Sequence, residues 1–295
     1  MSASATVQTR RRRTRARSAL SRGAYVVLGT VLSIVALAPI LATVIRSFQG
    51  RNADAEGLTL GSLTHLTLRN FSILFSPSAD ILHYAMNSAI VGVATAVVAL
   101  LVAVTAGYVL ARVRGRWVDV VFLLVLAPIV VPIQGLLTPL SVVLKDLGLL
   151  NTLAGVILVL ATYQLPFSIF VMRNSFAAIS VELEEAARLD GCSQLQVMLR
   201  VILPLSWPGF VTVGLFAFMA GWNDLITSVT FLSDQSTYTL PIALTLLSTH
   251  SNFGISVVDP GLVTGATTIA ALPVVALFLL LQRYYAEGLV AGSSR

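Results

Sequence analysis

The chain has 295 residues, of which 56% are hydrophobic and only 11% are charged, and its mean hydropathy is +0.88. Soluble domains usually carry about 25% charged residues, so this chain has too little charge to cover a water-facing surface. The formal net charge of +6 reflects a basic tail, since seven arginines lie within the first 22 residues. No aromatic residue interrupts that tail, which argues against nucleic-acid binding and favours a membrane protein.

Six segments are long and apolar enough to cross a bilayer, which requires roughly 20 mostly apolar residues. The sequence therefore predicts an all-α, polytopic membrane protein with six transmembrane helices. In chain order the segments are about Tyr25–Ile45; Ala89–Leu110; Trp117–Leu140, with Pro128, Pro132 and Pro139; Leu153–Met172, with Pro166; Gly209–Phe231; and Leu262–Leu281, with Pro273.

The first apolar segment could also be a cleavable signal peptide. It is longer than the usual apolar region of such peptides, about 7–15 residues, and no small-residue cleavage site ends it. We therefore interpret residues 1–22 as a basic cytoplasmic tail and residues 23–295 as one six-helix domain.

The distribution of basic residues predicts the orientation. With the N-terminus in the cytoplasm, 15 of the 19 basic residues fall on the cytoplasmic side. The four exceptions are Arg46, Arg51, Arg69 and Lys145, and the last is expected in an external loop. This asymmetry predicts a multi-pass membrane protein with both termini in the cytoplasm.

Catalytic and metal-binding patterns are missing from the sequence. It has no phosphate-binding G-x-x-x-x-G-K-[ST] loop and no nucleophile-elbow, H-E-x-x-H or C-x-x-C motif, and its single cysteine is Cys192. We expect no catalytic residues, no metal and no cofactor. Asn223 and Asp224 stand out as polar residues in the fifth segment. They could line a translocation path or form hydrogen bonds between helices, and Asp224 is the best candidate for an ion-coupled carrier.

The connection from Arg173 to Pro208 is the most hydrophilic internal stretch and predicts two short helices. Ser180 is a good N-cap, and Gly191 can end the first helix in the left-handed conformation. Ser193 with Gln196 forms a capping-box pattern for the second helix, which should end at Leu203-Pro204. Such a helix–turn–helix outside the bilayer could dock on a partner or pack beneath its own bundle.

This stretch resembles the EAA loop of ABC importer permeases. Glu185-Ala186-Ala187 is followed after three residues by Gly191, and nine residues later by Val201-x-Leu203-Pro204. Val201 replaces the isoleucine that is usual in this family. Further motifs are similar to the carbohydrate branch, and to the smaller permease of maltose-type importers in particular: Asn87-Ser88, Tyr108 to Arg112, Leu165-Pro166-Phe167, Gly221-Trp222-Asn223-Asp224, Tyr238-Thr239-Leu240-Pro241, Gln282-Arg283-Tyr284 and Gly288-Leu289.

The resemblance implies a transport subunit in the bacterial cytoplasmic membrane, not an enzyme. Its expected partners are a second permease, ATP-binding cassette ATPase subunits, an extracytoplasmic solute-binding protein and a sugar. Residues 173–208 would then dock on the ATPase, with Glu185, Ala186, Ala187, Gly191, Leu203 and Pro204 as its key residues. In maltose-type systems the other permease contacts the solute, so no substrate-binding residue is predicted beyond Asn223 and Asp224. A permease for a non-sugar solute remains an alternative, and an ion-coupled secondary transporter is a more distant one.

Overall fold

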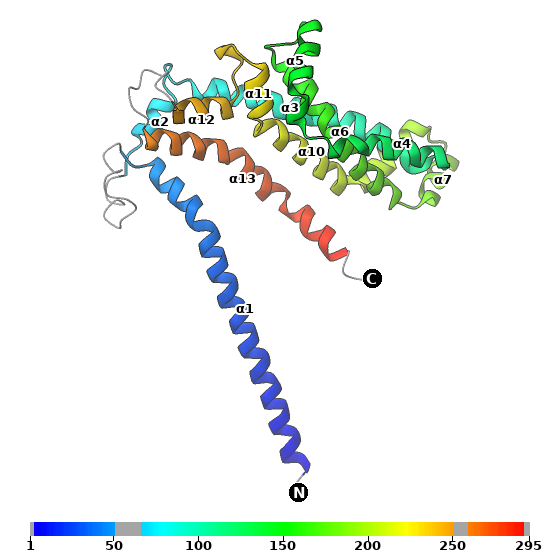
Figure 1. The fold of residues 1–295 in the computed structure, drawn as a ribbon. Helices are drawn as coiled ribbons and strands as arrows, with labels where there is room; N and C mark the ends of the chain where they lie inside the picture. The colour runs from blue at the N-terminus through cyan, green and yellow to red at the C-terminus, as the bar shows by residue number, and fades with distance from the viewer. Residues whose placement is uncertain (1–2, 51–65, 250–258, 292–295) are drawn as a thin grey trace. The chain divides into compact units, whose positions relative to one another are not determined.

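The computed structural model describes the backbone of residues 3–50, 66–249 and 259–291, with side chains for 25–50, 66–249 and 259–281 (Figure 1). The described chain is helical and forms two compact units, residues 1–72 with 260–268 and residues 73–259 with 269–295. The described residues do not include Arg51, His65 or His250. The side chains of the tail arginines and of the residues from Gln282 onward are not described either.

The first unit contains α1 (Ala3–Ser47), most of α2 (Arg69–Leu74) and the start of α13 (Pro260–Ala291). Its best-defined feature is the buried Asn70, which donates to the carbonyls of Ser47 (3.0 Å) and Gln49 (2.7 Å). A Cβ on Gly261 would lie 2.6 Å from the Asn70 amide nitrogen, so only glycine lets α13 pass this close. Asn70 thus joins three segments that are distant in sequence.

Three long helices form the centre of the second unit. They are α3 (Ile81–Arg112), α6 (Leu153–Ala177) and α10 (Trp207–Trp222), which run side by side in Figure 1. Glycine permits the close approaches, because a Cβ on Gly107 would meet the Met172 side chain at 2.9 Å and one on Gly221 would meet the Gly92 backbone at 2.7 Å. Small residues commonly allow such backbone contact between membrane helices.

Around this centre lie α4 (Arg116–Leu126), α5 (Leu137–Asp146), α11 (Ile226–Phe231) and α12 (Leu240–Thr249). One apolar cluster fills the end near α4 and contains Tyr108, Phe176 and Ile202. A second cluster, with Val91, Leu144 and Phe231, fills the other end.

The number of spans agrees with the prediction. Among the residues that the structure describes, four helices are long and apolar enough to cross a membrane, namely Tyr25–Ser47 within α1, α3, α6 and Pro260–Leu281 within α13. Two bent pairs, Arg116–Val130 with Ile133–Asp146 and Gln194–Leu205 with Trp207–Trp222, bring the number to as many as six.

The third span is interrupted, as the prolines in the predicted segment Trp117–Leu140 indicate. After α4, two 3₁₀ turns, Ala127–Val130 and Ile133–Leu136, lead into α5, and the two halves meet at 90°. Proline explains the break, because Pro132 has no amide hydrogen and disfavours helical geometry at Val131 before it. Val131 is accordingly extended, with φ −82° and ψ 119°.

Several boundaries also differ from the prediction. The second span begins at Ile81, not Ala89, and the fifth ends at Trp222, before Asn223 and Asp224. Lys145 lies in the last turn of α5 and not in a loop. The helix α12 was not predicted, because its 10 residues are too few for a membrane span.

Candidate functional site

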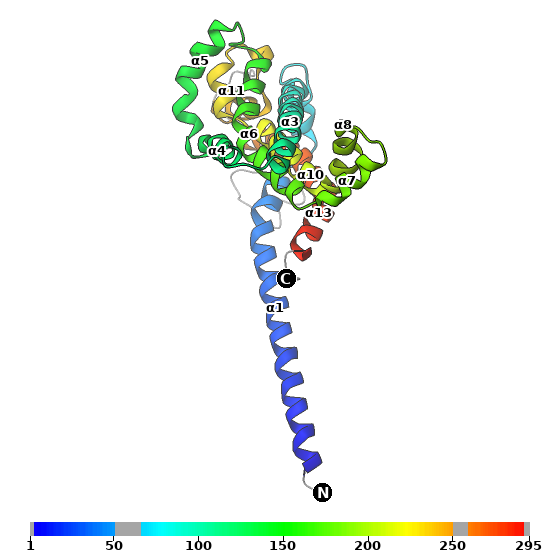
Figure 2. The same ribbon diagram turned by 90° about the vertical axis from the view of Figure 1, so that its right-hand side faces the viewer.

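The predicted helix–turn–helix is present within residues 173–208, here called the coupling segment, and its two arms lie next to each other as α7 (Val181–Leu189) and α8 (Gln194–Val197) in Figure 2. Ser180 caps α7, its hydroxyl accepting from the Glu182 amide at 3.3 Å. Gly191 has φ 88°, which is the left-handed conformation that glycine adopts without strain. Both the cap and the turn glycine are therefore confirmed.

The second arm starts as predicted but ends differently. Ser193 and Gln196 form the full capping box, with bonds of 2.8 and 3.4 Å. After the four residues of α8, Met198–Ile202 form a π-helical turn that leads into the short α-helix α9 (Leu203–Leu205). Pro204 has no amide hydrogen to continue the α-helical pattern, which accounts for an irregular end. The chain then bends by 82° into α10.

The residues of the EAA pattern divide between the surface and the core. Glu185, Ala186, Gly191 and Pro204 are exposed, whereas Ala187 and Leu203 pack against the apolar cluster below. Exposed apolar side chains surround the pattern, including Leu189 at 90% and Leu195 at 61%. The outer face of the segment thus combines small and apolar side chains with the exposed charges of Glu182, Glu185, Arg188 and Asp190, and such an exposed apolar patch is typical of a docking surface.

Glu184 was not predicted as a site residue, yet it is only 2% exposed. Its carboxylate accepts from the Tyr108 hydroxyl at 2.8 Å and from Nε of Arg112, and Arg188 lies 3.8 Å away. Gln194 in α8 donates to the Tyr108 oxygen at 2.6 Å. A signal for this cluster existed, because residues four apart share a helix face and both Tyr108–Arg112 and Glu184–Arg188 have that spacing.

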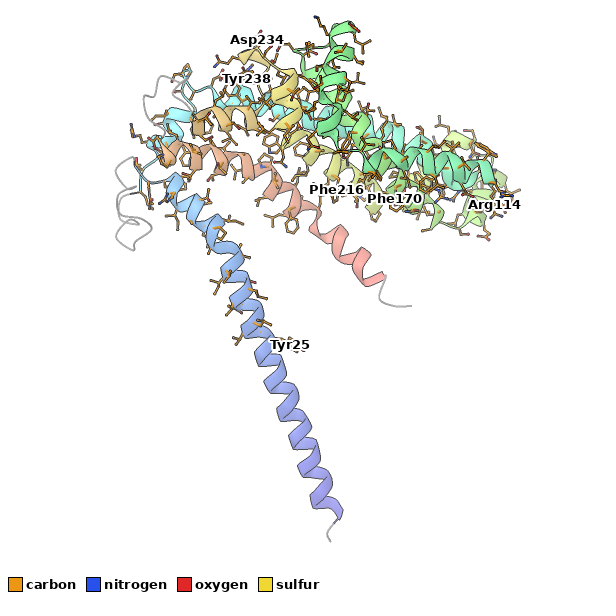
Figure 3. All side chains as sticks on the ribbon, in the orientation of Figure 1. Tyr25, Arg114, Phe170, Phe216, Asp234 and Tyr238 are labelled. Atoms are coloured by element: carbon orange, nitrogen blue, oxygen red, sulfur yellow. The ribbon has the colours of Figure 1, made fainter. Side chains whose placement is uncertain are left out.

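Basic side chains gather at the end of the second unit that carries α7. Arg112, Arg114, Arg173 and Arg188 belong to this end. Figure 3 shows Arg114 there, whereas Asp234 and Tyr238 lie toward the opposite end. Arg173 also lies over the Phe122 ring, 4.2 Å from its centroid.

Two motifs that are distant in sequence meet at that opposite end. The Asn87 amide donates to the carbonyls of Ser236 (3.0 Å) and Tyr238 (2.9 Å). The Ser88 hydroxyl accepts from the Leu240 amide at 2.9 Å. The start of α3 therefore holds the segment between α11 and α12 in a defined position.

Asn223 and Asp224 lie in the break between α10 and α11. Asp224 is half-buried, and its carboxylate accepts from the Ser228 amide (2.7 Å), the Ser228 hydroxyl (2.9 Å) and the Thr227 amide (3.4 Å). Asn223 is exposed and donates to the Met219 carbonyl at 3.2 Å. Asp224 thus stabilises the start of α11. The sequence had left open whether it lines a path or forms hydrogen bonds between helices.

Acidic, histidine and cysteine side chains form no group of three or more suited to a metal within the part of the chain that the structure describes. Cys192 is a free thiol, partly buried against the apolar cluster beneath α7.

Comparison with known proteins places this arrangement in a family. Residues 99–289 match the family model described as "Binding-protein-dependent transport system inner membrane component". "Probable ABC transporter permease protein YurM" of Bacillus subtilis is 36% identical over 71% of this chain and 68% of that protein. "Sulfoquinovosyl glycerol transport system permease protein SmoH" of Agrobacterium fabrum is 30% identical over 83% and 85% of the two chains. "Diacetylchitobiose uptake system permease protein DasC" of Streptomyces coelicolor is 33% identical over 71% and 74%.

The fold agrees with a solved structure, "Crystal structure of a bacterial ABC transporter involved in the import of the acidic polysaccharide alginate". The TM-score is 0.76 at 23% identity, over 92% of this chain and 98% of the other. The family match, the identity to the permeases and the helix–turn–helix below the bundle agree with one another, and the chain is a member of the binding-protein-dependent transport system inner membrane component family of ABC permeases.

Proposed function

We propose that this chain and a second permease form the translocation path of an ATP-driven importer for a carbohydrate. An extracytoplasmic solute-binding protein delivers the solute, and separate ATPase subunits hydrolyse ATP. The carrying observation is the exposed outer face of the coupling segment, where Glu185 and Ala186 stand beside Leu189 on a helix whose other face is anchored.

The proposed roles follow the burial of each residue. Exposed Glu185 pairs with a basic group of the ATPase subunit, and exposed Ala186 lets that subunit approach closely. Ala187 and Leu203 fix the segment to the bundle. Gly191 supplies the turn between the two arms. Asn223 remains a candidate for the path because it is exposed, whereas the bonds of Asp224 favour a structural role.

The arginines around α7 support an orientation with the coupling segment and both termini in the cytoplasm, because basic residues concentrate on that side of membrane proteins. A thiol-labelling experiment tests this orientation. In a Cys192→Ser background, Asp234→Cys should react with a membrane-impermeant maleimide in intact spheroplasts. Arg114→Cys should react only after permeabilisation. Both side chains are exposed, so the reverse pattern would contradict the orientation.

A carbohydrate substrate is supported by the names of two relatives, which transport sulfoquinovosyl glycerol and diacetylchitobiose. Uptake of labelled oligosaccharides by vesicles that contain the full complex tests this class. Uptake of only non-sugar solutes, with the binding protein present, would favour the alternative permease.

The docking of the coupling segment is tested with a matched pair of glycines. Gly191 and Gly148 both follow a helix, both have a left-handed φ (88° and 69°), and both have open space around them. Each also donates its amide to a carbonyl at 3.0 Å, Arg188 for Gly191 and Lys145 for Gly148. Proline fits neither position, since its φ is fixed near −65°.

We expect Gly191→Pro to abolish copurification of the ATPase subunit from nanodiscs, while Gly148→Pro retains it. Equal membrane insertion and equal size-exclusion profiles serve as the control for folding. Full copurification with Gly191→Pro, or loss with both variants, would show that this segment is not the docking site.

A further inference from the structure

We infer that Glu184, together with Tyr108 and Arg112, is a positioning set that fixes the orientation of α7 on the end of α3. The inference rests on the proposed docking role of the coupling segment, and it assigns the transmission of movement to three side chains. None of the three touches the outer face. The EAA pattern contains Glu185, whereas its neighbour Glu184 is the residue that bonds to α3.

The contacts of the set join four parts of the chain. Arg112, the last residue of α3, binds the Glu184 carboxylate through Nε and the Ile179 carbonyl through Nη2 at 3.2 Å. Tyr108, one turn earlier, donates to Glu184 at 2.8 Å and accepts from Gln194 of α8 at 2.6 Å. The approach to α7, α7 itself and the start of α8 are therefore all bound to one turn of α3.

Burial makes this set decisive for geometry. Glu184 is 2% exposed and the Arg112 side chain 12%, so water does not replace the partners readily. A buried carboxylate without its partners is strongly unfavourable, so α7 is held where Glu184 reaches both groups. An ion pair of this kind contributes more to a specific arrangement than to net stability, and here the arrangement is the direction of one short helix.

The direction of α7 determines where Glu185 points. Successive residues of an α-helix are turned by about 100°, so fixing Glu184 inward turns Glu185 to the outer face. A helix of nine residues is too short to hold its own conformation or position in water. Ala187 packs on the apolar cluster and Ser180 caps α7, but neither bonds to α3 through a polar group.

The set also lies at one end of a rigid element. The 32 residues of α3 extend over about 48 Å, more than the bilayer core. At its start, Asn87 and Ser88 hold the segment between α11 and α12. A displacement of α7 is thus passed to α3 by Glu184, and α3 carries it to the opposite end of the unit.

The test measures the position of α7 directly. Spin labels at Leu101→Cys in α3 and Leu183→Cys in α7, both exposed positions, report the distance between the two helices by pulsed electron paramagnetic resonance in nanodiscs. Cys192 is replaced by serine in all samples. The variants are Glu184→Gln, Tyr108→Phe and Arg112→Gln, with Glu185→Gln as the matched control one residue away.

We expect Glu184→Gln to broaden the α7–α3 distance distribution and to reduce ATPase stimulation by the loaded binding protein at least tenfold. Tyr108→Phe should broaden it less, since only one hydroxyl is lost. The double variant Glu184→Gln/Arg112→Gln should broaden the distance distribution no more than either single variant, because the effects of residues that act as a unit are not additive. Glu185→Gln should leave the distance distribution unchanged and weaken ATPase copurification.

An unchanged distance distribution in Glu184→Gln would overturn the inference, as would additive effects in the double variant. Both results are independent of the ATPase subunit, because the distance is measured in the chain alone as well as in the complex. Failure of the docking role appears instead in the Gly191→Pro copurification experiment. The two ideas can therefore fail separately.

Discussion

The crossing of α3 and α10 at Gly221 offers the sharpest test of the packing. A Cβ at Gly221 would lie 2.7 Å from Cα of Gly92 and 2.9 Å from its nitrogen, whereas ordinary Cβ contacts begin at 3.4 Å. Both neighbours are backbone atoms, so no side chain can rotate away. Gly221→Ala therefore requires the two helices to separate locally by about 0.7 Å, the difference between 3.4 and 2.7 Å.

Gly214 of the same helix is the matched control. A Cβ there would meet only Cδ1 of Leu100, at 3.4 Å, which is an ordinary contact with a flexible side chain. Alanine gains about 1 kcal/mol of helix propensity at Gly214, inside α10, and less at Gly221, next to its last residue. Overpacking costs about 1–3 kcal/mol at Gly221, so Gly221→Ala should be the less stable variant.

Thermal unfolding of the purified chain in nanodiscs measures this difference. One kcal/mol shifts Tm by about 2–4 °C in domains of 150–250 residues, so Gly221→Ala should unfold several degrees below Gly214→Ala. Equal Tm values for the two variants would refute the close crossing and the packing argument built on it.

Three further predictions concern local bonds, and amide hydrogen exchange checks each of them. Asp224→Ala should speed exchange at Ser228 because the first turn of α11 loses its acceptor, worth about 1 kcal/mol, whereas Asn223→Ala should not; equal rates would contradict the capping role. Gly191→Ala should speed exchange in the turn after α7, since a left-handed alanine costs about 1–2 kcal/mol although the site is open; unchanged rates would argue against that conformation. Ser193→Ala removes the acceptor of the capping box and should loosen the start of α8 by about 1 kcal/mol, and no change there would show that the box contributes nothing.

Local signals in the sequence were sufficient for the caps and the turn of the coupling segment. Ser180, Gly191 and the Ser193–Gln196 pair each act on backbone groups within a few residues, so their structural effect does not depend on distant parts of the chain. The number of spans was predictable for a similar reason, because hydrophobic length is a property of a continuous segment.

Broken helices were less predictable. A proline indicates an interruption, but the 90° bend after α4 depends on how the two halves pack against α6 and α11. Asp224 was ambiguous for the same reason, since a polar residue in an apolar run can face a path, a neighbouring helix or its own backbone. The structure assigns its carboxylate to the amides of Thr227 and Ser228.

Composition, hydrophobic length and the gapped EAA pattern by themselves determined that this is a polytopic helical permease, and they located the helix–turn–helix that we propose docks on the ATPase. Only the tertiary structure distinguished Glu184 from Glu185, which are adjacent acids in the same helix. Glu184 is buried and bonded to Tyr108 and Arg112, which lie more than 70 residues away in sequence, whereas Glu185 is exposed. The four-residue spacings of Tyr108–Arg112 and Glu184–Arg188 indicate which residues share a helix face, but only contacts between distant segments bring the two faces together.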